Sequence, residues 1–274
     1  MNGIYKIMII ANLTGGLGGQ MFQYAAGRAL SLKLKTPLKL HFTNALFNTQ
    51  RQYGLDIFNI KANLATDAEI AKLGVIKNQV INRFLYLAQL MNIRLLKNVY
   101  TEKLNDEYDP DFFNIPDNFC IQGYFANEKY FKNIETTIRK DFTFKNKLDE
   151  KNQKFKDLIT KYESVSIHVR RGDYITNKTG PRFIGLDYYI KAIKTISNKI
   201  KNPIYFIFSD DIVWGKQYLK LKNISYFVDN NHGKDSYKDM QLMSLCKHNI
   251  VANSTFSWWG SWLNTNKNKV IIKP

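Results

Sequence analysis

Short apolar runs alternate along the second half of the chain with longer stretches in which apolar residues recur every three or four positions. The runs predict strands at 165–169, 204–208, 224–228, 249–252 and 270–272. The longer stretches predict helices at 186–200, 212–221, 236–247 and 256–264, and a long loop follows the first strand. Strands that alternate with helices of this length predict an α/β fold, with a parallel sheet and helices on both of its faces.

The first half of the chain begins with the same alternation. It predicts, in order, a strand at 5–11, a glycine-rich turn at 14–20, a helix to about residue 35 and a strand at 38–42. Helical periodicity returns at 65–96, and residues 97–135 predict no clear element. We place a domain boundary in the lysine-rich helix predicted at 146–162, which divides the chain into domains 1–150 and 151–274.

The charge of the chain points to an anionic partner, an anionic surface or solubility. There are 40 Lys and Arg against 23 Asp and Glu, a formal net charge of +17. The lysines are scattered and form no block of consecutive basic residues, which argues against nucleic acid and favours solvated helix faces. Nucleotide-sugar phosphates and membrane phosphates remain compatible with this charge.

The cysteines and the N-terminus favour a cytoplasmic protein. Cys120 and Cys246 are far apart and form no C-x-x-C pair, so neither a disulfide framework nor a zinc site is predicted. The apolar run at 5–13 is too short to span a bilayer, and no small-residue cleavage site follows it.

Ligands of open parallel sheets bind beyond the carboxyl ends of the strands, and the first such loop of the second half carries two arginines. The segment is His168-Val169-Arg170-Arg171-Gly172-Asp173-Tyr174. An arginine fork can hold a pyrophosphate and stabilise the charge of a nucleoside-diphosphate leaving group. Alternatively, Asp173 pairs with Arg170 or Arg171 as a structural ion pair, and the residues alone leave both interpretations open.

Two further loops after strands carry polar groups. Asp210 and Asp211 could bind a metal, bind a ribose or guanine, or cap the helix that follows, and capping by one of them is favoured over metal binding. Ser254 and Thr255 open a helix, where capping and phosphate contact are compatible uses of the free amides. The tryptophans at 258–259 are expected in the core.

The glycine-rich turn is weaker by itself. Its spacing is not G-x-G-x-x-G, and the chain has neither a G-x-S-x-G elbow nor a Walker A sequence, which argues against a hydrolase or a P-loop NTPase. His168 is expected to orient its loop or the substrate. The other histidines have no companion at metal-ligand spacing.

Taken together, these segments resemble the bacterial α-1,2-fucosyltransferases of glycosyltransferase family 11. The resemblance lies in Gly15-Gly16-Leu17-Gly18-x-Gln20-Met21-Phe22-Gln23-Tyr24, His168–Tyr174, Phe208-Ser209-Asp210-Asp211, Asn253–Gly260 and Gln122-Gly123-Tyr124-Phe125-x-Asn127-Glu128-Lys129-Tyr130-Phe131. It implies a GT-B-like fold of two Rossmann-type domains facing a cleft, with 1–150 on the acceptor side and 151–274 binding GDP-fucose. It also implies inverting transfer to the 2-hydroxyl of a terminal galactose, in O-antigen or capsule synthesis, without metal or cofactor.

The resemblance also implies a role for each matching residue. Arg170 and Arg171 would hold the diphosphate, with His168 and Asp173 shaping their loop. Asp210 or Asp211 would bind the guanine or ribose. Ser254, Thr255 and Phe256 would line the phosphate and fucose, which Gly16 and Gln20 would face from the other domain. Glu128 is a candidate base or a helix cap.

Two departures from the family pattern and two alternative functions accompany this interpretation. Family members usually have Asn at the position of Gly19, and relatives usually continue beyond the position of Pro274. The alternative functions are a GT-B transferase with another nucleotide-sugar and a non-catalytic basic protein that binds polyanions. The positive charge also suggests peripheral contact with the inner membrane, next to a lipid-linked acceptor.

Overall fold

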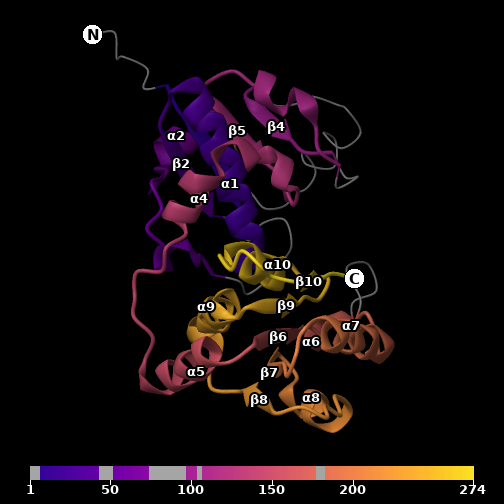
Figure 1. Cartoon of the computed structure of the whole chain (residues 1–274). Helices are drawn as coiled ribbons and strands as arrows, with labels where there is room; N and C mark the ends of the chain where they lie inside the picture. The colour runs from indigo at the N-terminus through magenta and orange to yellow at the C-terminus, as the bar shows by residue number, and fades with distance from the viewer. Residues whose placement is uncertain (1–6, 43–51, 74–96, 104–106, 177–182) are drawn as a thin grey trace, which may run out of the picture. The chain divides into compact units, whose positions relative to one another are not determined.

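The computed structural model describes residues 7–42, 52–73, 97–103, 107–176 and 183–274 (Figure 1). The chain divides into two compact units, Met1–Lys145 and Asn146–Pro274, and each is described by itself. None of the helices in the described ranges is long and apolar enough to cross a membrane.

The N-terminal unit contains a parallel sheet whose strand order is β3-β2-β1-β5-β4. Its strands are β1 (Ile9–Leu13), β2 (Leu38–Phe42), β3 (Asn63–Leu64), β4 (Val99–Thr101) and β5 (Phe119–Gln122). Its α-helices are α1 (Leu17–Leu34), α2 (Asp67–Lys72) and α4 (Glu135–Asp141). Short 3-10 helices are η1 (Leu55–Ile57), η2 (Pro110–Asn114), η3 (Glu128–Tyr130) and η4 (Lys132–Ile134).

The predicted strands and first helix of this unit are confirmed, and three strands, β3, β4 and β5, were missed. The predicted strand at 5–11 begins later, at Ile9, and its residues 5 and 6 lie outside the described residues. The helical periodicity at 65–96 contains α2, and residues 74–96 lie outside the described part. The stretch without a prediction contains β4 and β5, which pair with each other because their apolar residues cover a shared core.

Helix α1 packs closely against the central strand of this sheet. A Cβ at Gly27 would lie 2.9 Å from the Cβ of Ala11 and 3.0 Å from a methyl of Leu38, so a larger residue would push the helix off the sheet. The glycine therefore sets how near the helix lies to β1 and β2.

The C-terminal unit contains a second parallel sheet, with strand order β10-β9-β6-β7-β8. The strands are β6 (Ser164–Val169), β7 (Ile204–Ser209), β8 (Ser225–Val228), β9 (His248–Ile250) and β10 (Ile271–Ile272). The helices are α5 (Glu150–Lys161), α6 (Gly172–Thr176), α7 (Leu186–Lys199), α8 (Ile212–Tyr218), η5 (Gly233–Asp235), α9 (Tyr237–Leu245) and α10 (Thr255–Leu263). The predicted strands and helices are confirmed within a few residues, and the predicted long loop is corrected, since it contains α6.

Helices cover both faces of this sheet, as predicted. On one face, Val165, Ile167 and Ile207 pack against α7 and α8 in a continuous apolar core. On the other face, Asn249 donates to the hydroxyl of Ser166 at 2.7 Å and to the carbonyl of Met243 in α9 at 2.9 Å. The α/β class therefore holds for each unit, with a parallel sheet in both.

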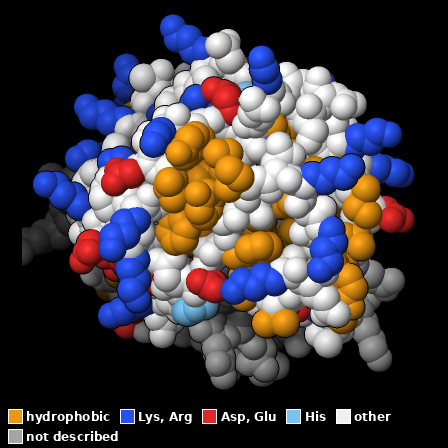
Figure 2. All heavy atoms as spheres, turned by 60° about the horizontal axis from the view of Figure 1, so that its bottom comes forward, with side chains coloured by type: hydrophobic (Ala, Val, Ile, Leu, Met, Phe, Trp, Pro, Cys, Tyr) orange, Lys and Arg blue, Asp and Glu red, His pale blue; other side chains and the backbone are white. Residues whose placement is uncertain are grey.

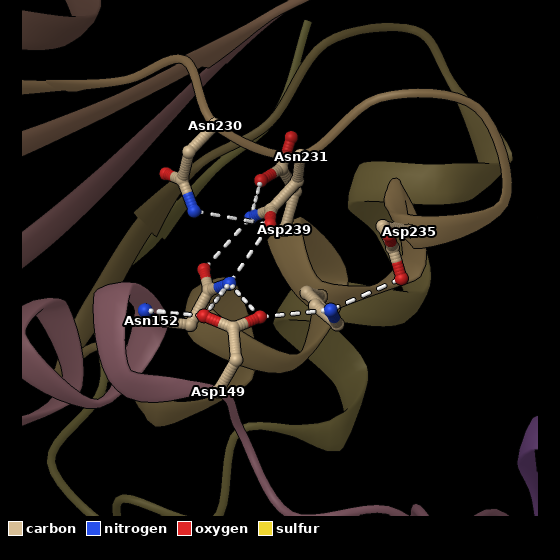
Figure 3. Close-up of polar contacts among 7 residues, drawn as sticks. Asp149, Asn152, Asn230, Asn231, Asp235 and Asp239 are labelled. Carbon is tan, nitrogen blue, oxygen red and sulfur yellow. Dashed lines mark hydrogen bonds and ion pairs between the residues drawn. The ribbon is translucent and has the colours of Figure 1, made fainter.

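A buried polar network joins α5 to α9 (Figure 3). Asn152 and Asn231 exchange two side-chain hydrogen bonds of 2.9 Å, and Asn231 donates to the Asp239 carboxyl at 2.7 Å. Asp149 caps α5 and accepts from Lys238 of α9 at 2.8 Å. Burial raises the pKa of the Asp239 carboxyl to about 7.

Candidate active site

The arginine loop and the aspartate loop begin side by side at one end of the C-terminal sheet. β6 is buried along its whole length and ends at Val169, and its parallel neighbour β7 ends at Ser209. Val169 and Ser209 are partners in the strand register. Because parallel strands end at the same edge of a sheet, the residues that follow β6 meet those that follow β7.

Arg170 is shared between two carboxylates. Its two terminal nitrogens each lie 2.8 Å from a carboxylate oxygen, one of Asp173 and the other of Asp210. The second oxygen of Asp210 accepts from the backbone N–H of Arg171 at 2.8 Å. The structural ion pair considered for Asp173 is therefore present, while 23% of the Arg170 side chain stays exposed to a ligand.

The aspartate loop approaches the arginine loop at a glycine. A Cβ at Gly172 would lie 2.7 Å from an oxygen of Asp210, closer than atoms can normally approach. A residue without a side chain is therefore needed here for Asp210 to reach Arg170 and the Arg171 amide together.

Arg171 lies in an aromatic setting and pairs with the second aspartate of the neighbouring loop. One of its terminal nitrogens contacts the Asp211 carboxylate, and its guanidinium carbon lies 5.5 Å from the Trp214 ring and 5.8 Å from the Phe183 ring. Its Nε is buried and has no hydrogen-bond partner among the described residues. Asp211 also accepts from the N–H of Trp214 at 3.0 Å, which confirms that it caps α8.

His168 is a buried, neutral imidazole at the end of β6. Burial and then the positive charge of Arg170 lower the pKa of His168 to about 3. Its Nδ1 has no hydrogen-bond partner among the described residues, and its ring lies 5.7 Å from that of Phe256. At neutral pH this side chain offers hydrogen bonding without charge.

The third predicted loop is joined to the first through Tyr174. The Tyr174 ring lies 5.3 Å from the guanidinium of Arg170, and its hydroxyl donates to the carbonyl of Asn253 at 3.4 Å. Ser254 accepts from the N–H of Phe256 at 3.3 Å and so caps α10, whose first residue is Thr255. Trp259 is fully buried, as expected for the core, and Trp258 is half-buried.

The structure thus brings nine of the predicted site residues together at one edge of the C-terminal sheet. They are His168, Arg170, Arg171, Asp173, Asp210, Asp211, Ser254, Thr255 and Phe256. The arrangement places two guanidinium groups, a neutral imidazole and the N-terminus of α10 around the loops that follow β6, β7 and β9. Groups of this kind bind a diphosphate and stabilise the negative charge that develops when it departs.

The predicted residues of the glycine-rich turn lie in the N-terminal unit. Gly16 caps α1 and has open space where a side chain would stand. Gln20 is fully buried, and its amide donates to the carbonyls of Gly15 at 3.0 Å and Gln52 at 2.9 Å and accepts from the N–H of Gly54 at 3.0 Å. In this structure Gln20 positions the turn, and contact between it and a ligand stays a prediction.

Glu128 also lies in this unit. It is half-buried and forms the first residue of η3, after the cap Asn127, whose side chain accepts from the N–H of Lys129 at 3.0 Å. Its role as a base stays a prediction.

Sequence reasoning assigned no role to several residues that shape the site. Gly172 and Tyr174 stand inside the arginine segment, so their proximity to it was available as a signal. Trp214 lies three residues after the capping aspartate, on the first turn of α8. Phe183 follows a stretch outside the described residues, and no local pattern connects it with Arg171.

The family described as "Glycosyl transferase family 11" matches residues 6–274. The chain is 34% identical to the O-antigen biosynthesis glycosyltransferase WbnK of Escherichia coli, covering 96% of this chain and 92% of the relative. It is also 34% identical to an α-1,2-colitosyltransferase of Escherichia coli, with 97% and 91% coverage.

Two more distant similarities complete the comparison. The mouse galactoside 2-α-L-fucosyltransferase Sec1 is 25% identical over 172 residues, which cover 58% of this chain and 46% of that protein. A crystal structure of the α-1,6-fucosyltransferase NodZ soaked with GDP-fucose superposes with a TM-score of 0.52 at 12% identity, covering 94% of this chain and 92% of NodZ. The likeness to NodZ supports the predicted GT-B-like fold class, and the family match over residues 6–274 shows that this chain belongs to glycosyltransferase family 11.

Proposed function

We propose that this glycosyltransferase moves L-fucose from GDP-β-L-fucose, with inversion, onto the 2-hydroxyl of a terminal galactose in an O-antigen or capsule glycan. The proposal includes turnover without a metal or a cofactor. The observation that carries it is the Arg170–Arg171 loop, in which two guanidinium groups follow the end of β6, each held by a carboxylate and each partly exposed.

The two arginines suit a departing diphosphate. Each guanidinium is oriented by a carboxylate, so the loop is ordered before the donor binds and little reorganisation is needed as charge develops. A diphosphate oxygen can accept from the exposed part of the Arg171 guanidinium group, and the exposed part of Arg170 can reach a second oxygen. The guanidinium groups then stabilise GDP as the bond to the sugar breaks.

His168 fits a positioning role better than that of a general base. A pKa of about 3 leaves it unprotonated at neutral pH but weakly basic, so it removes a proton from a hydroxyl poorly. Its buried ring lies 5.7 Å from that of Phe256, so it can position the loops that hold the sugar in line for attack by the acceptor hydroxyl. This geometry would produce inversion, because the acceptor attacks opposite the departing GDP.

The comparisons favour this donor class and leave a second sugar as an alternative. One relative at 34% identity is an α-1,2-colitosyltransferase, and colitose is L-fucose without its 3-hydroxyl. A more distant relative is a galactoside 2-α-L-fucosyltransferase. Both names give an α-1,2 or 2-α linkage, so the linkage is common to the two candidate reactions while the donor sugar differs.

The decisive experiment measures GDP release with GDP-fucose or GDP-colitose and a panel of galactose-ended disaccharides, in the presence of EDTA. We expect turnover with GDP-fucose that survives EDTA and is lost in Arg171→Ala. Arg139→Ala is the matched control, because Arg139 also pairs with a carboxylate but belongs to α4 of the N-terminal unit and is not part of these loops. Faster turnover with GDP-colitose would replace fucose by colitose as the donor, and absence of GDP binding by calorimetry would refute the proposal.

A further inference from the structure

Helix α8 and the segment that leads from it into β8 expose several large apolar side chains. Val213 is 71% exposed, Ile224 is 62% exposed and Tyr218 is 44% exposed. The core contacts of this segment are made by other residues, Trp214 and Leu219, which pack against the α7 side of the sheet. The Tyr218 ring stacks on Trp214 at 5.3 Å, whereas Val213 and Ile224 add apolar surface outside this core.

Lysines, and no carboxylates, lie between these apolar groups in the sequence. Residues 212–228 contain three lysines and no Asp or Glu. Lys216 pairs with Asp229 at 3.0 Å, whereas the structure pairs neither Lys220 nor Lys222 with a carboxylate among the residues that it describes. All three lysines are exposed. We call the exposed residues Val213, Lys216, Tyr218, Lys220, Lys222 and Ile224 the α8–β8 surface.

This surface lies at the edge of the C-terminal sheet. β8 is the last strand in the order and pairs with β7 alone. Figure 2 shows the face of the molecule that is at the bottom of Figure 1, where α8 and β8 lie, and apolar patches on it have many Lys and Arg and fewer Asp and Glu side chains around them. Exposed apolar groups beside lysines match the interface of an anionic bilayer, where the apolar groups enter the headgroup region and the lysines meet phosphates.

We propose that the α8–β8 surface docks this enzyme on an anionic phospholipid membrane. A second copy of the chain is a poorer occupant, because a twofold contact through this surface would bring the unpaired lysines of both copies together. Nucleic acid is poorer as well, because a polyanion that binds through phosphates gains nothing from the exposed Val213 and Ile224.

Docking here would hold the donor loops close to the bilayer. Asp211 caps the first turn of α8 and also pairs with Arg171, and the helix has seven residues. At 1.5 Å per residue, α8 spans about 10 Å between the arginine loop and the lysines beyond its C-terminus. An acceptor carried on a membrane lipid would then meet the enzyme from the side on which the enzyme is bound.

The test is sedimentation of the full chain with vesicles of phosphatidylcholine containing roughly one-third phosphatidylglycerol, against vesicles of phosphatidylcholine alone. We expect binding to the anionic vesicles that weakens with salt. Lys220→Ala/Lys222→Ala should lower the partition coefficient about 30-fold, and Ile224→Asn should lower it roughly tenfold. The control, Lys194→Ala/Lys267→Ala, removes two exposed lysines from α7 and from the loop before β10 and should bind as the unaltered chain does.

Turnover with a soluble disaccharide acceptor serves as the folding control and should be unchanged in all of these variants. Equal vesicle binding by the Lys220→Ala/Lys222→Ala and Lys194→Ala/Lys267→Ala proteins would overturn the proposal, because net charge alone would then explain the binding. Binding that is insensitive to phosphatidylglycerol would also overturn it. So would a concentration-dependent dimer, seen by light scattering, that Ile224→Asn abolishes.

Discussion

Gly172→Ala tests whether the close approach of the aspartate loop organises the arginines. Gly172 has no positive φ, so alanine is compatible with its backbone and the change acts through space alone. The new Cβ would lie 2.7 Å from an oxygen of Asp210 and 3.3 Å from its carboxyl carbon. Asp210 must then move away from Arg170, from the N–H of Arg171, or from both.

The magnitude follows from the contacts that are lost. A hydrogen bond to a charged group contributes about 1.5–3 kcal/mol, and replacing glycine by alanine in a helix returns about 0.5–1 kcal/mol. We therefore expect Gly172→Ala to lower the free energy of unfolding by about 1–2 kcal/mol. If the loosened arginines lose the same amount toward a diphosphate, GDP affinity falls about tenfold, since 1.4 kcal/mol corresponds to a factor of ten.

Urea denaturation and calorimetric titration with GDP measure these two effects. Gly215→Ala, inside α8, is the matched control. Its new Cβ would make an ordinary contact of 3.5 Å with Phe227 of β8, so this change should leave GDP affinity unchanged and should not lower stability. A double-mutant cycle with Asp210→Ala identifies the cause, because Gly172→Ala should cost nothing once the carboxylate is gone. The reasoning would be refuted if Gly172→Ala still lowered the free energy of unfolding as much in the Asp210→Ala protein. It would also be refuted if GDP affinity were unchanged in the Gly172→Ala protein.

Three further predictions concern other parts of the molecule. Arg170→Lys should lower kcat/KM about 10- to 100-fold, because one ammonium cannot bridge two carboxylates as the guanidinium does; steady-state kinetics at saturating acceptor would show it, and full activity would contradict the bridging role. Gly19→Ala should raise the free energy of unfolding by about 0.5–1 kcal/mol, because alanine favours a helix over glycine and its Cβ would make only an ordinary contact of 3.6 Å with the Thr14 carbonyl oxygen. Urea denaturation measures this change, and a loss of stability would mean that the start of α1 needs glycine. Asp239 has a pKa raised from 3.8 to about 7, so the folded state binds a proton that the unfolded state releases, and its contribution to stability is lost as pH rises from about 4 through 7. Asp239→Asn should remove up to about 4 kcal/mol of this pH dependence, measured as the difference between the stability–pH curves of the two proteins, and parallel curves would show that the carboxyl does not titrate in this range.

Much of the C-terminal unit was predictable from local pattern. β6 and β7 are apolar runs whose residues are buried on both faces, and such runs predict central parallel strands. Their ends identify the loops where a ligand binds, so the predicted arginine and aspartate segments do lie together. The helix caps at Asp211 and Ser254 were also predictable, because a cap is a contact between residues close in sequence.

Other features depended on residues that are distant in sequence. The alignment of Val169 with Ser209 places two arginines against two aspartates, and one residue of slip would have sent these side chains in other directions. In the N-terminal unit, β4 and β5 carry too few apolar residues in a row to predict strands. They form because they pair with each other and because β5 also pairs with β1.

The hydrophobic pattern of the sequence thus determined most of the alternation of strands and helices and located the loops that carry the chemistry. The motifs in these loops indicated the family. Tertiary structure alone decided that Gly172 lets Asp210 reach the arginines and that Phe183 and Trp214 flank Arg171. It also directed the amide of Gln20 to Gln52 and Gly54. The reason is physical: periodicity reports which side of an element is buried, whereas the partners of a buried polar group are set by strand register and by the packing of segments far apart in the chain.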